Sequence, residues 1–232
     1  MKIYGITDKG IVRQSNQDSF YVNEAQGWCV IADGMGGHNG GETASTLAVR
    51  TISEVLSKPW DDTEDAMRTA IVEANNAVFK KSSESKELNG MGTTVVLVMM
   101  DGNIAYIGHV GDSRAYYING EKIIQLTKDH SIVQKLIESG TITPKQAKTH
   151  PQKNLITRAV GTDRYVEIDV NRVICTKGDY ILLCTDGLSS MVDESDMFKI
   201  IMQNPDTAVK ELIDAANSAG GTDNITAVLI NL

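Results

Sequence analysis

Basic residues are few and long apolar runs are missing in this chain of 232 residues. Lysine and arginine together number 22 against 30 aspartates and glutamates, giving a formal net charge of −8 at pH 7. A surface of this charge disfavours nucleic acid as a partner, because neutralising phosphates requires a basic face. No apolar run approaches the roughly 20 residues of a membrane span, and the first residues lack the features of a signal peptide. We therefore expect a cytoplasmic protein that does not contact a membrane.

Cysteine is also scarce. The three cysteines, Cys29, Cys175 and Cys184, each lie within or beside an apolar run. An odd number in such settings favours buried reduced thiols over a disulfide framework. The paired cysteine spacing that is typical of structural zinc sites is absent.

Linkers and repeats are missing too, and only four prolines are present, so we expect one domain over residues 1–232. Alternating or continuous apolar runs predict the strands Ile3–Thr7, Phe20–Asn23, Trp28–Ala32, Thr93–Met100, Asn103–His109, Ala115–Ile118, Lys122–Leu126, Glu167–Ile174, Tyr180–Cys184 and Ile225–Ile230. Helical spacing predicts Glu42–Leu56, a helix capped by Asp62 and Thr63 that continues to Val78, Glu194–Gln203 and Asp206–Ser218. Two antiparallel sheets packed face to face, with helices outside, would bury all these apolar faces. The sequence leaves the strand order open.

Four aspartates have similar and unusual settings. Each follows or precedes a predicted core strand and has a glycine nearby: Asp33, Asp112, Asp186 and Asp223. Strand ends place side chains reproducibly, and glycine lets backbone and ligand approach closely. Carboxylates gathered at one end of a core would repel one another unless cations neutralise them, and such oxygen-rich sites suit magnesium or manganese. The alternative is that the four residues simply form turns or caps.

Eight short motifs then make the chain resemble the metal-dependent protein phosphatase family, protein phosphatase type 2C, in its compact bacterial form. They occur along the whole length and in the family's order: Arg13-Gln14-Ser15-Asn16-Gln17-Asp18, Ala32-Asp33-Gly34-Met35-Gly36-Gly37, Gly92-Thr93-Thr94, Gly111-Asp112-Ser113-Arg114, Thr127-Lys128-Asp129-His130-Ser131, Thr157-Arg158-Ala159-Val160-Gly161, Cys184-Thr185-Asp186-Gly187-Leu188 and Thr222-Asp223-Asn224-Ile225-Thr226. A single motif of this kind would be weak evidence, whereas eight in order are specific.

The resemblance implies an α+β fold, a four-layer αββα sandwich with the metal site in a cleft at one end of the sheets. It implies Mn²⁺ or Mg²⁺ as cofactor. By this similarity Asp33 bridges two core ions, the backbone carbonyl of Gly34 reaches one of them, and Asp186 and Asp223 hold the other.

Three further residues carry roles through the same resemblance. Asp112, together with Asp186, matches the site of a weaker third ion. Asp18 lies in the cleft and either ligates through water or supports the ligands, so that Arg13, Asp18 and Asp33 form the catalytic group. Arg13 matches the arginine that grips the substrate phosphate, where a planar bidentate donor suits phosphate oxygens.

The implied reaction is hydrolysis of phosphoserine or phosphothreonine in proteins by a water that bridges two divalent cations, without a covalent phosphoenzyme. The sequence agrees, since no cysteine stands six residues before an arginine and no Asp-x-Asp-x-Thr run offers an aspartyl nucleophile. One departure concerns the leaving group: many eukaryotic members have histidine where this chain has Met35, which cannot donate a proton. The proton for the leaving alcohol must then come from metal-bound water or from another residue such as His38, while His109 and His130 are expected to be structural.

The segment His130–Ala159 corresponds to the family's variable flap, and its lysines suit either a substrate-facing lid or an ordinary solvated loop. Rival functions are a metal-dependent phosphodiesterase or nuclease, a degenerate fold that only binds partners, and a phosphatase of small molecules. By similarity we expect a monomer that acts on phosphoproteins and is opposed by a serine/threonine kinase in bacterial signalling.

Overall fold

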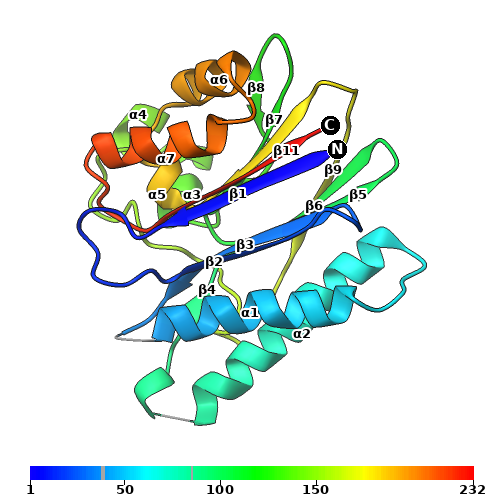
Figure 1. Cartoon of the computed structure of the whole chain (residues 1–232). Coiled ribbons are helices and arrows are strands. Elements are labelled where there is room, and N and C mark those ends of the chain that lie inside the picture. The colour runs from blue at the N-terminus through cyan, green and yellow to red at the C-terminus, as the bar shows by residue number, and fades with distance from the viewer. Residues whose placement is uncertain (38–39, 85) are drawn as a thin grey trace.

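The computed structural model describes residues 1–37, 40–84 and 86–232. Its strands form two antiparallel sheets that pack face to face, and helices cover both outer faces (Figure 1). The αββα sandwich expected from the sequence is therefore confirmed. Within these described residues, no helix is both long enough and apolar enough to cross a membrane.

The first sheet brings the two ends of the chain together. Its strand order is β1-β11-β10-β7-β8, and every neighbouring pair is antiparallel. The strands span β1 Lys2–Asp8, β11 Ile225–Asn231, β10 Tyr180–Cys184, β7 Arg114–Ile118 and β8 Ile123–Gln125. Because β1 pairs with β11, both termini lie side by side at one end of the sandwich (Figure 1).

The second sheet has the order β2-β3-β5-β6-β9, and the short strand β4 pairs with the end of β3. The strands span β2 Asp18–Asn23, β3 Trp28–Met35, β4 Gly92–Thr93, β5 Val95–Asp101, β6 Ile104–Val110 and β9 Asp169–Ile174. In the register of β2 with β3, Asp18 lies directly opposite Asp33. That pairing brings two of the predicted site residues together.

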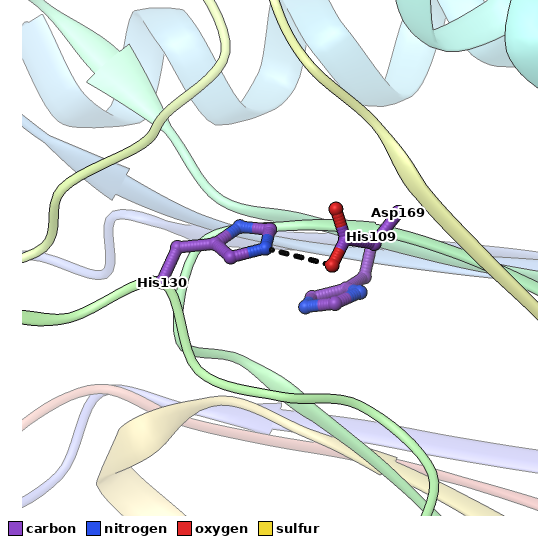
Figure 2. A group of neighbouring side chains, drawn as sticks. All are labelled: His109, His130 and Asp169. Atoms are coloured by element: carbon purple, nitrogen blue, oxygen red, sulfur yellow. Dashed lines mark ion pairs between the residues drawn. The ribbon is translucent and has the colours of Figure 1, made fainter. Parts of the chain in front are cut away.

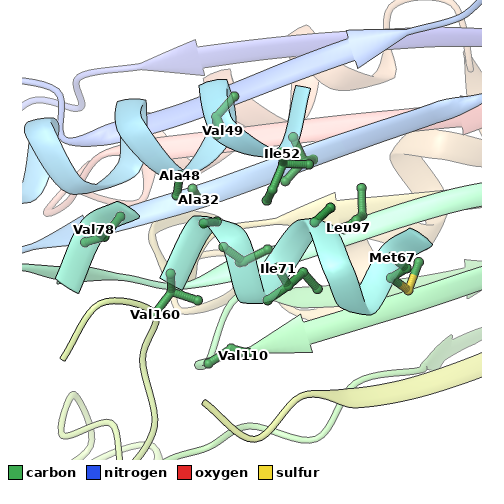
Figure 3. Close-up of a cluster of buried hydrophobic side chains, with 14 of the residues drawn as sticks. Ala32, Ala48, Val49, Ile52, Met67, Ile71, Val78, Leu97, Val110 and Val160 are labelled. Carbon is green, nitrogen blue, oxygen red and sulfur yellow. The ribbon is translucent and has the colours of Figure 1, made fainter. Parts of the chain in front are cut away.

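The helices divide between the two outer faces. They span α1 Gly40–Leu56, α2 Thr63–Glu84, η1 Lys86–Leu88, α3 Ile132–Glu138, α4 Pro144–Ala147, α5 Asp186–Ser189, α6 Glu194–Gln203 and α7 Ala208–Ser218. Helices α1 and α2 pack their apolar stripes on the second sheet, as Ile52, Ile71 and Leu97 illustrate in Figure 3. On the first sheet, α5, α6 and α7 bury a separate cluster that includes Leu188 and Leu212.

A third apolar cluster fills the space between the sheets. Ile31, Val96 and Ile107 from the second sheet meet Ile181 and Val228 from the first. The three cysteines are free and buried, as predicted. Removing this much apolar surface from water supplies the main driving force for folding and makes the sandwich a rigid support for its ends.

Local structure departs from the sequence prediction in two informative places. The expected strand Thr93–Met100 is interrupted at Thr94, which leaves the ladder and hydrogen-bonds to Asp33 and Ser113 through its side chain. The helix α5 was not predicted, because four residues starting at Asp186 are too few to show helical periodicity. Both departures lie at the cleft end of the sandwich.

Candidate metal centre

A cleft of about 260 Å³ lies at one end of the sheets, and six of the seven predicted site residues line it. They are Arg13, Asp33, Gly34, Asp112, Asp186 and Asp223. Asp33 and Gly34 come from the end of β3. Asp186 begins α5 and is separated from β10 only by Thr185, and Asp223 is separated from β11 only by Asn224. Tertiary structure thus gathers at one place four aspartates that are as much as 190 positions apart in the chain.

The backbone of Asp33 is fixed by Thr94. The N–H of Asp33 donates to the Thr94 hydroxyl at 2.9 Å, and the Thr94 N–H donates to the Asp33 carbonyl at 2.9 Å. The Thr93 hydroxyl also donates to that carbonyl, at 2.8 Å. These bonds hold the carboxylate of Asp33 at a defined position in the cleft, which ligand geometry demands.

The glycines that follow Asp33 and Asp186 are required by close backbone contacts. A Cβ on Gly34 would lie 2.0 Å from the carbonyl oxygen of Gly41, and one on Gly187 would lie 1.9 Å from that of Asn224. No side chain fits at such distances, so only glycine lets these backbone segments meet. The glycine of each Asp-Gly pair therefore allows close backbone packing, of β3 against α1 and of α5 against the start of β11.

Asp18 occupies a different position from the other carboxylates, because it lies beneath the cleft and is only 6% exposed. Its Oδ2 accepts hydrogen bonds from the Thr185 hydroxyl at 2.9 Å and the Thr226 hydroxyl at 2.6 Å. Its Oδ1 is buried without a protein partner. Burial raises the pKa of Asp18 to about 7, although the two hydroxyl bonds act in the opposite direction.

The electrostatics of the cleft call for added positive charge. Burial first, and then the neighbouring carboxylates, raise the pKa of Asp33 and of Asp186, and the pKa of Asp112 to about 7. Among the described residues that line the cleft, Arg13 is the only basic one; its Nη2 donates to Asp223 Oδ2 at 2.7 Å.

The donor set itself fits hard divalent cations. Besides Asp18 Oδ1, the buried Oδ1 of Asp186 has no hydrogen-bond partner, so carboxylate lone pairs remain available. Oxygen ligands of this kind suit magnesium and manganese, and a cation there would remove the repulsion between the carboxylates. The residues present therefore fit the metal that the sequence implied.

Several residues of the cleft escaped the sequence analysis. Asn154 and Ile156, from the segment expected to be a flap, line the cleft, although no motif singled them out. Asn224 ties two loops together, since its Oδ1 accepts from the Gln17 N–H and its Nδ2 donates to the Ser15 carbonyl. Asn224 and Thr185 stood inside recognised motifs, so their motifs were the available signal.

No histidine among the described residues lines the cleft. Met35 lines the cleft and its thioether carries no proton to donate. His38 lies outside the described residues. His109 and His130 form part of a separate group beside the cleft with Asp169 (Figure 2).

That separate group is held by an arginine. The two imidazoles stack with centroids 4.5 Å apart, and His130 Nε2 lies 3.3 Å from Asp169 Oδ2. Arg158 Nη1 lies 2.7 Å from Asp169 Oδ1 and 2.9 Å from His130 Nε2. A guanidinium thus provides the positive charge that a metal would bring. The Gly111 N–H donates to His130 Nδ1, so that nitrogen is unprotonated.

These contacts match the structural role expected of His130. Its own N–H also donates to the Gly111 carbonyl at 2.8 Å, so His130 clamps both backbone groups of the residue before Asp112. The N–H of Thr157 donates to the His130 carbonyl at 2.6 Å. The turn that carries Asp112 is therefore bonded to the segment that ends the flap.

Comparison with known sequences identifies one family along nearly the whole chain. The family model described as Protein phosphatase 2C matches residues 11–220. The serine/threonine phosphatase stp of Listeria monocytogenes is 38% identical over 234 aligned positions, covering 97% of this chain and 93% of the relative. Protein phosphatase PhpP of Streptococcus pneumoniae is 38% identical over 240 positions, covering 100% and 98%.

Solved structures of serine/threonine phosphatases are also similar to this chain. The Mycobacterium tuberculosis serine/threonine phosphatase PstP/Ppp superposes with a TM-score of 0.93 at 35% identity, covering 100% of this chain and 98% of that one. The catalytic domain of the phosphatase PstP in complex with 2 manganese ions gives a TM-score of 0.89 at 34% identity, covering 98% and 96%.

The raised pKa of Asp18 predicts how metal-free stability depends on pH. Asp18 binds its proton more tightly in the folded chain, where its pKa is about 7, than in the unfolded chain, where an aspartate has a pKa of ~3.9. Its contribution to the free energy of unfolding therefore falls as pH rises from ~4 to ~7. With chelator at pH 7.5, Asp18→Asn should be more stable than wild type by at least about 1 kcal/mol, or ~2–4 °C in Tm.

Thermal unfolding at pH 7.5 and pH 5 checks this prediction. The advantage of Asp18→Asn should shrink at the lower pH, because wild-type Asp18 is then protonated. Asp61→Asn, an exposed aspartate in the loop between α1 and α2, is the matched control and should change nothing. A variant that is destabilised equally at both pH values would contradict the argument.

Proposed function

The chain belongs to the protein phosphatase 2C family and is a serine/threonine protein phosphatase, and from this premise we propose how its own residues carry out the reaction. The proposal is hydrolysis of phosphoserine and phosphothreonine by water at two divalent cations, with no covalent phosphoenzyme. The observation that carries it is the convergence of Asp33, Asp186, Asp223 and Arg13 in one cleft.

The proposed ligands divide between two core ions and a weaker third one. Asp33 and the carbonyl of Gly34 would hold the core ions with Asp186 and Asp223, and Asp112 with Asp186 would hold the third. The manganese ions in a solved relative support the core pair. The unpartnered Asp186 Oδ1 and the raised carboxyl pKa values support the same assignment.

When bound, such ions lower the pKa of water and neutralise phosphoryl oxygens. The side chains of the protein would bind the phosphate and position the site. Arg13 is half exposed at the rim, and its guanidinium can bind two phosphate oxygens at once. Asp18 positions the floor of the site through Thr185 and Thr226. A covalent route through cysteine is disfavoured, because Cys29 and Cys184 are fully buried and burial raises the pKa of each thiol.

We further propose that residues 1–232 form a single catalytic domain with a flap at about 130–159. Its support is that Asn154 and Ile156 reach the cleft from this segment. The segment contains α3 and α4, and the capping box of Thr143 with Gln146 begins α4. A cytoplasmic monomer that opposes a serine/threonine kinase in bacterial signalling stays a prediction from the sequence.

The first functional prediction concerns metal. Hydrolysis of a phosphothreonine peptide should require added Mn²⁺ or Mg²⁺ and stop with chelator, because the carboxylates alone repel a phosphate dianion. Added metal should also raise Tm, since it binds only the folded chain. Phosphate release and Tm are measured with manganese, magnesium and chelator. Full activity after exhaustive chelation would refute the proposed mechanism, while cleavage of DNA or RNA but not of phosphopeptide would favour a nuclease.

Arg13 generates a second prediction. Arg13→Ala should act mainly by raising KM for phosphopeptide, if the guanidinium grips ground state and transition state alike. Arg13→Lys should restore only part of the loss, because an ammonium cannot form the bidentate contact. Steady-state kinetics of both variants at saturating manganese provide the measurement. If kcat/KM of Arg13→Ala equals that of wild type, Arg13 has no role in binding phosphate.

Asp112 generates a third. Asp112→Ala should lower turnover of phosphopeptide while the core ions still bind, and saturating metal should not restore the rate. If Asp112 only orders its turn, the substitution should cost about 1 kcal/mol of stability and leave kcat unchanged. Calorimetric counting of bound manganese beside kinetics on the same variant distinguishes the two roles. Asp129, which pairs with Arg114 near Asp112, provides the comparison variant Asp129→Asn.

A further inference from the structure

A groove of about 280 Å³ adjoins the metal cleft, and the two hollows share Met35 and Ile156 as lining residues. The groove is formed by the end of β3 and by the segment 156–166, which follows the flap. A peptide whose phosphate lies in the cleft can therefore reach the groove with a neighbouring residue. Neither the phosphate chemistry nor the proposed metal ligands involve this groove.

The walls of the groove suit an aliphatic chain. Met35, Ile156, Ala159 and Val166 contribute apolar surface, and Tyr165 stands at the rim with 86% of its surface exposed. The Met35 side chain packs closely over Gly92, because a Cβ added to Gly92 would lie only 2.9 Å from the terminal methyl of Met35. An exposed aromatic ring beside a lined hollow is a typical contact surface for a ligand.

The charge of the groove is negative on balance. Arg158 lines it, but two carboxylates neutralise the guanidinium: Asp169 at 2.7 Å and Glu167 at 2.7 Å. Asp163 also lines the groove and is exposed, and across residues 1–37, 40–84 and 86–232 its carboxylate has no ion pair or hydrogen bond. Arg164 is exposed but is not a lining residue. One unpaired carboxylate thus remains at the edge of an apolar groove.

We propose that this groove is a substrate subsite that binds a lysine or arginine side chain near the phosphorylated residue. The long methylene stem would lie along Met35 and Ile156, and the cationic head would meet Asp163 and the ring of Tyr165. Such side chains characteristically bury the stem and keep the head in water, and a cation over an aromatic face adds attraction. The inference rests on the proposed phosphatase function and adds a preference in sequence to it.

Other occupants fit less well. An acidic substrate side chain would meet Asp163 and the nearby carboxylates of the cleft, which repel it. A purely aliphatic side chain would cover Asp163 without pairing it, and that desolvation disfavours binding. Of the three classes, only a basic side chain satisfies both the apolar walls and the charge.

The test uses phosphothreonine peptides that carry either lysine or norleucine at one of the three positions on each side. Norleucine keeps the stem and removes the charge. With wild type and manganese, kcat/KM should favour lysine by roughly 5-fold at one or two of these positions, as expected for an exposed ion pair. Asp163→Asn should reduce that ratio to about 1, and Asp163→Lys should reverse the preference so that a glutamate peptide is favoured over lysine.

Controls separate the groove from the catalytic centre. Hydrolysis of p-nitrophenyl phosphate, which has no peptide to reach the groove, should be the same for wild type, Asp163→Asn and Tyr165→Ala. Tyr165→Ala should lower kcat/KM for lysine peptides, and Tyr165→Phe should retain it, because the ring rather than the hydroxyl is invoked. Asp61→Asn, at another exposed aspartate, should leave the lysine preference unchanged.

The outcomes distinguish the two proposals. Ratios near 1 at all six positions, or a lysine preference that survives Asp163→Asn, would overturn the subsite while leaving the phosphatase function intact. Failure of wild type to hydrolyse any phosphopeptide with manganese would instead overturn the proposed function itself.

Discussion

Repulsion among buried carboxylates is the constraint on which the cleft end of this molecule depends. Asp18, Asp33, Asp112 and Asp186 are held in or beneath one cleft with Arg13 as the only basic lining residue among those described. Hydrophobic burial between and outside the sheets supplies the free energy that keeps these groups together. Because this charge is unfavourable without cations, part of the stability of the sandwich is spent on holding together the carboxylates that we propose as metal ligands.

Support for the cleft comes from backbone contacts as much as from side chains. Thr94 leaves its strand to bond Asp33, and Gly34 and Gly187 let neighbouring backbones approach closer than any Cβ would permit. The segment after β8 is tied in through His130, which binds both backbone groups of Gly111 and accepts the Thr157 N–H at its carbonyl. The turn of Asp112 and the segment that borders both hollows are therefore mechanically linked, while Asn154 and Ile156 remain at the cleft edge.

The cleft and the adjoining groove offer different chemical groups to a substrate. The cleft gathers the groups that fit phosphate and metal, and their chemistry is the same for every phosphoserine or phosphothreonine. The groove beyond Met35 and Ile156 is lined by Asp163 and Tyr165, which are not among the proposed metal ligands, so discrimination among peptides is the role available to them. A methionine at the shared wall serves both hollows, since it offers apolar surface to a peptide and no proton to the leaving group.

The sequence by itself determined most elements of the sandwich and the identity of the carboxylates. Apolar periodicity predicted α6 at its observed ends, and the Asp-Gly pairs pointed to Asp33 and Asp186, because such patterns depend on near neighbours in the chain. Only the tertiary structure decided the strand order, the place of Asp18 opposite Asp33 and beneath the cleft, and the contribution of Ile156. These features arise from contacts between residues far apart in sequence, and no local pattern encodes which distant strand or loop a side chain will meet.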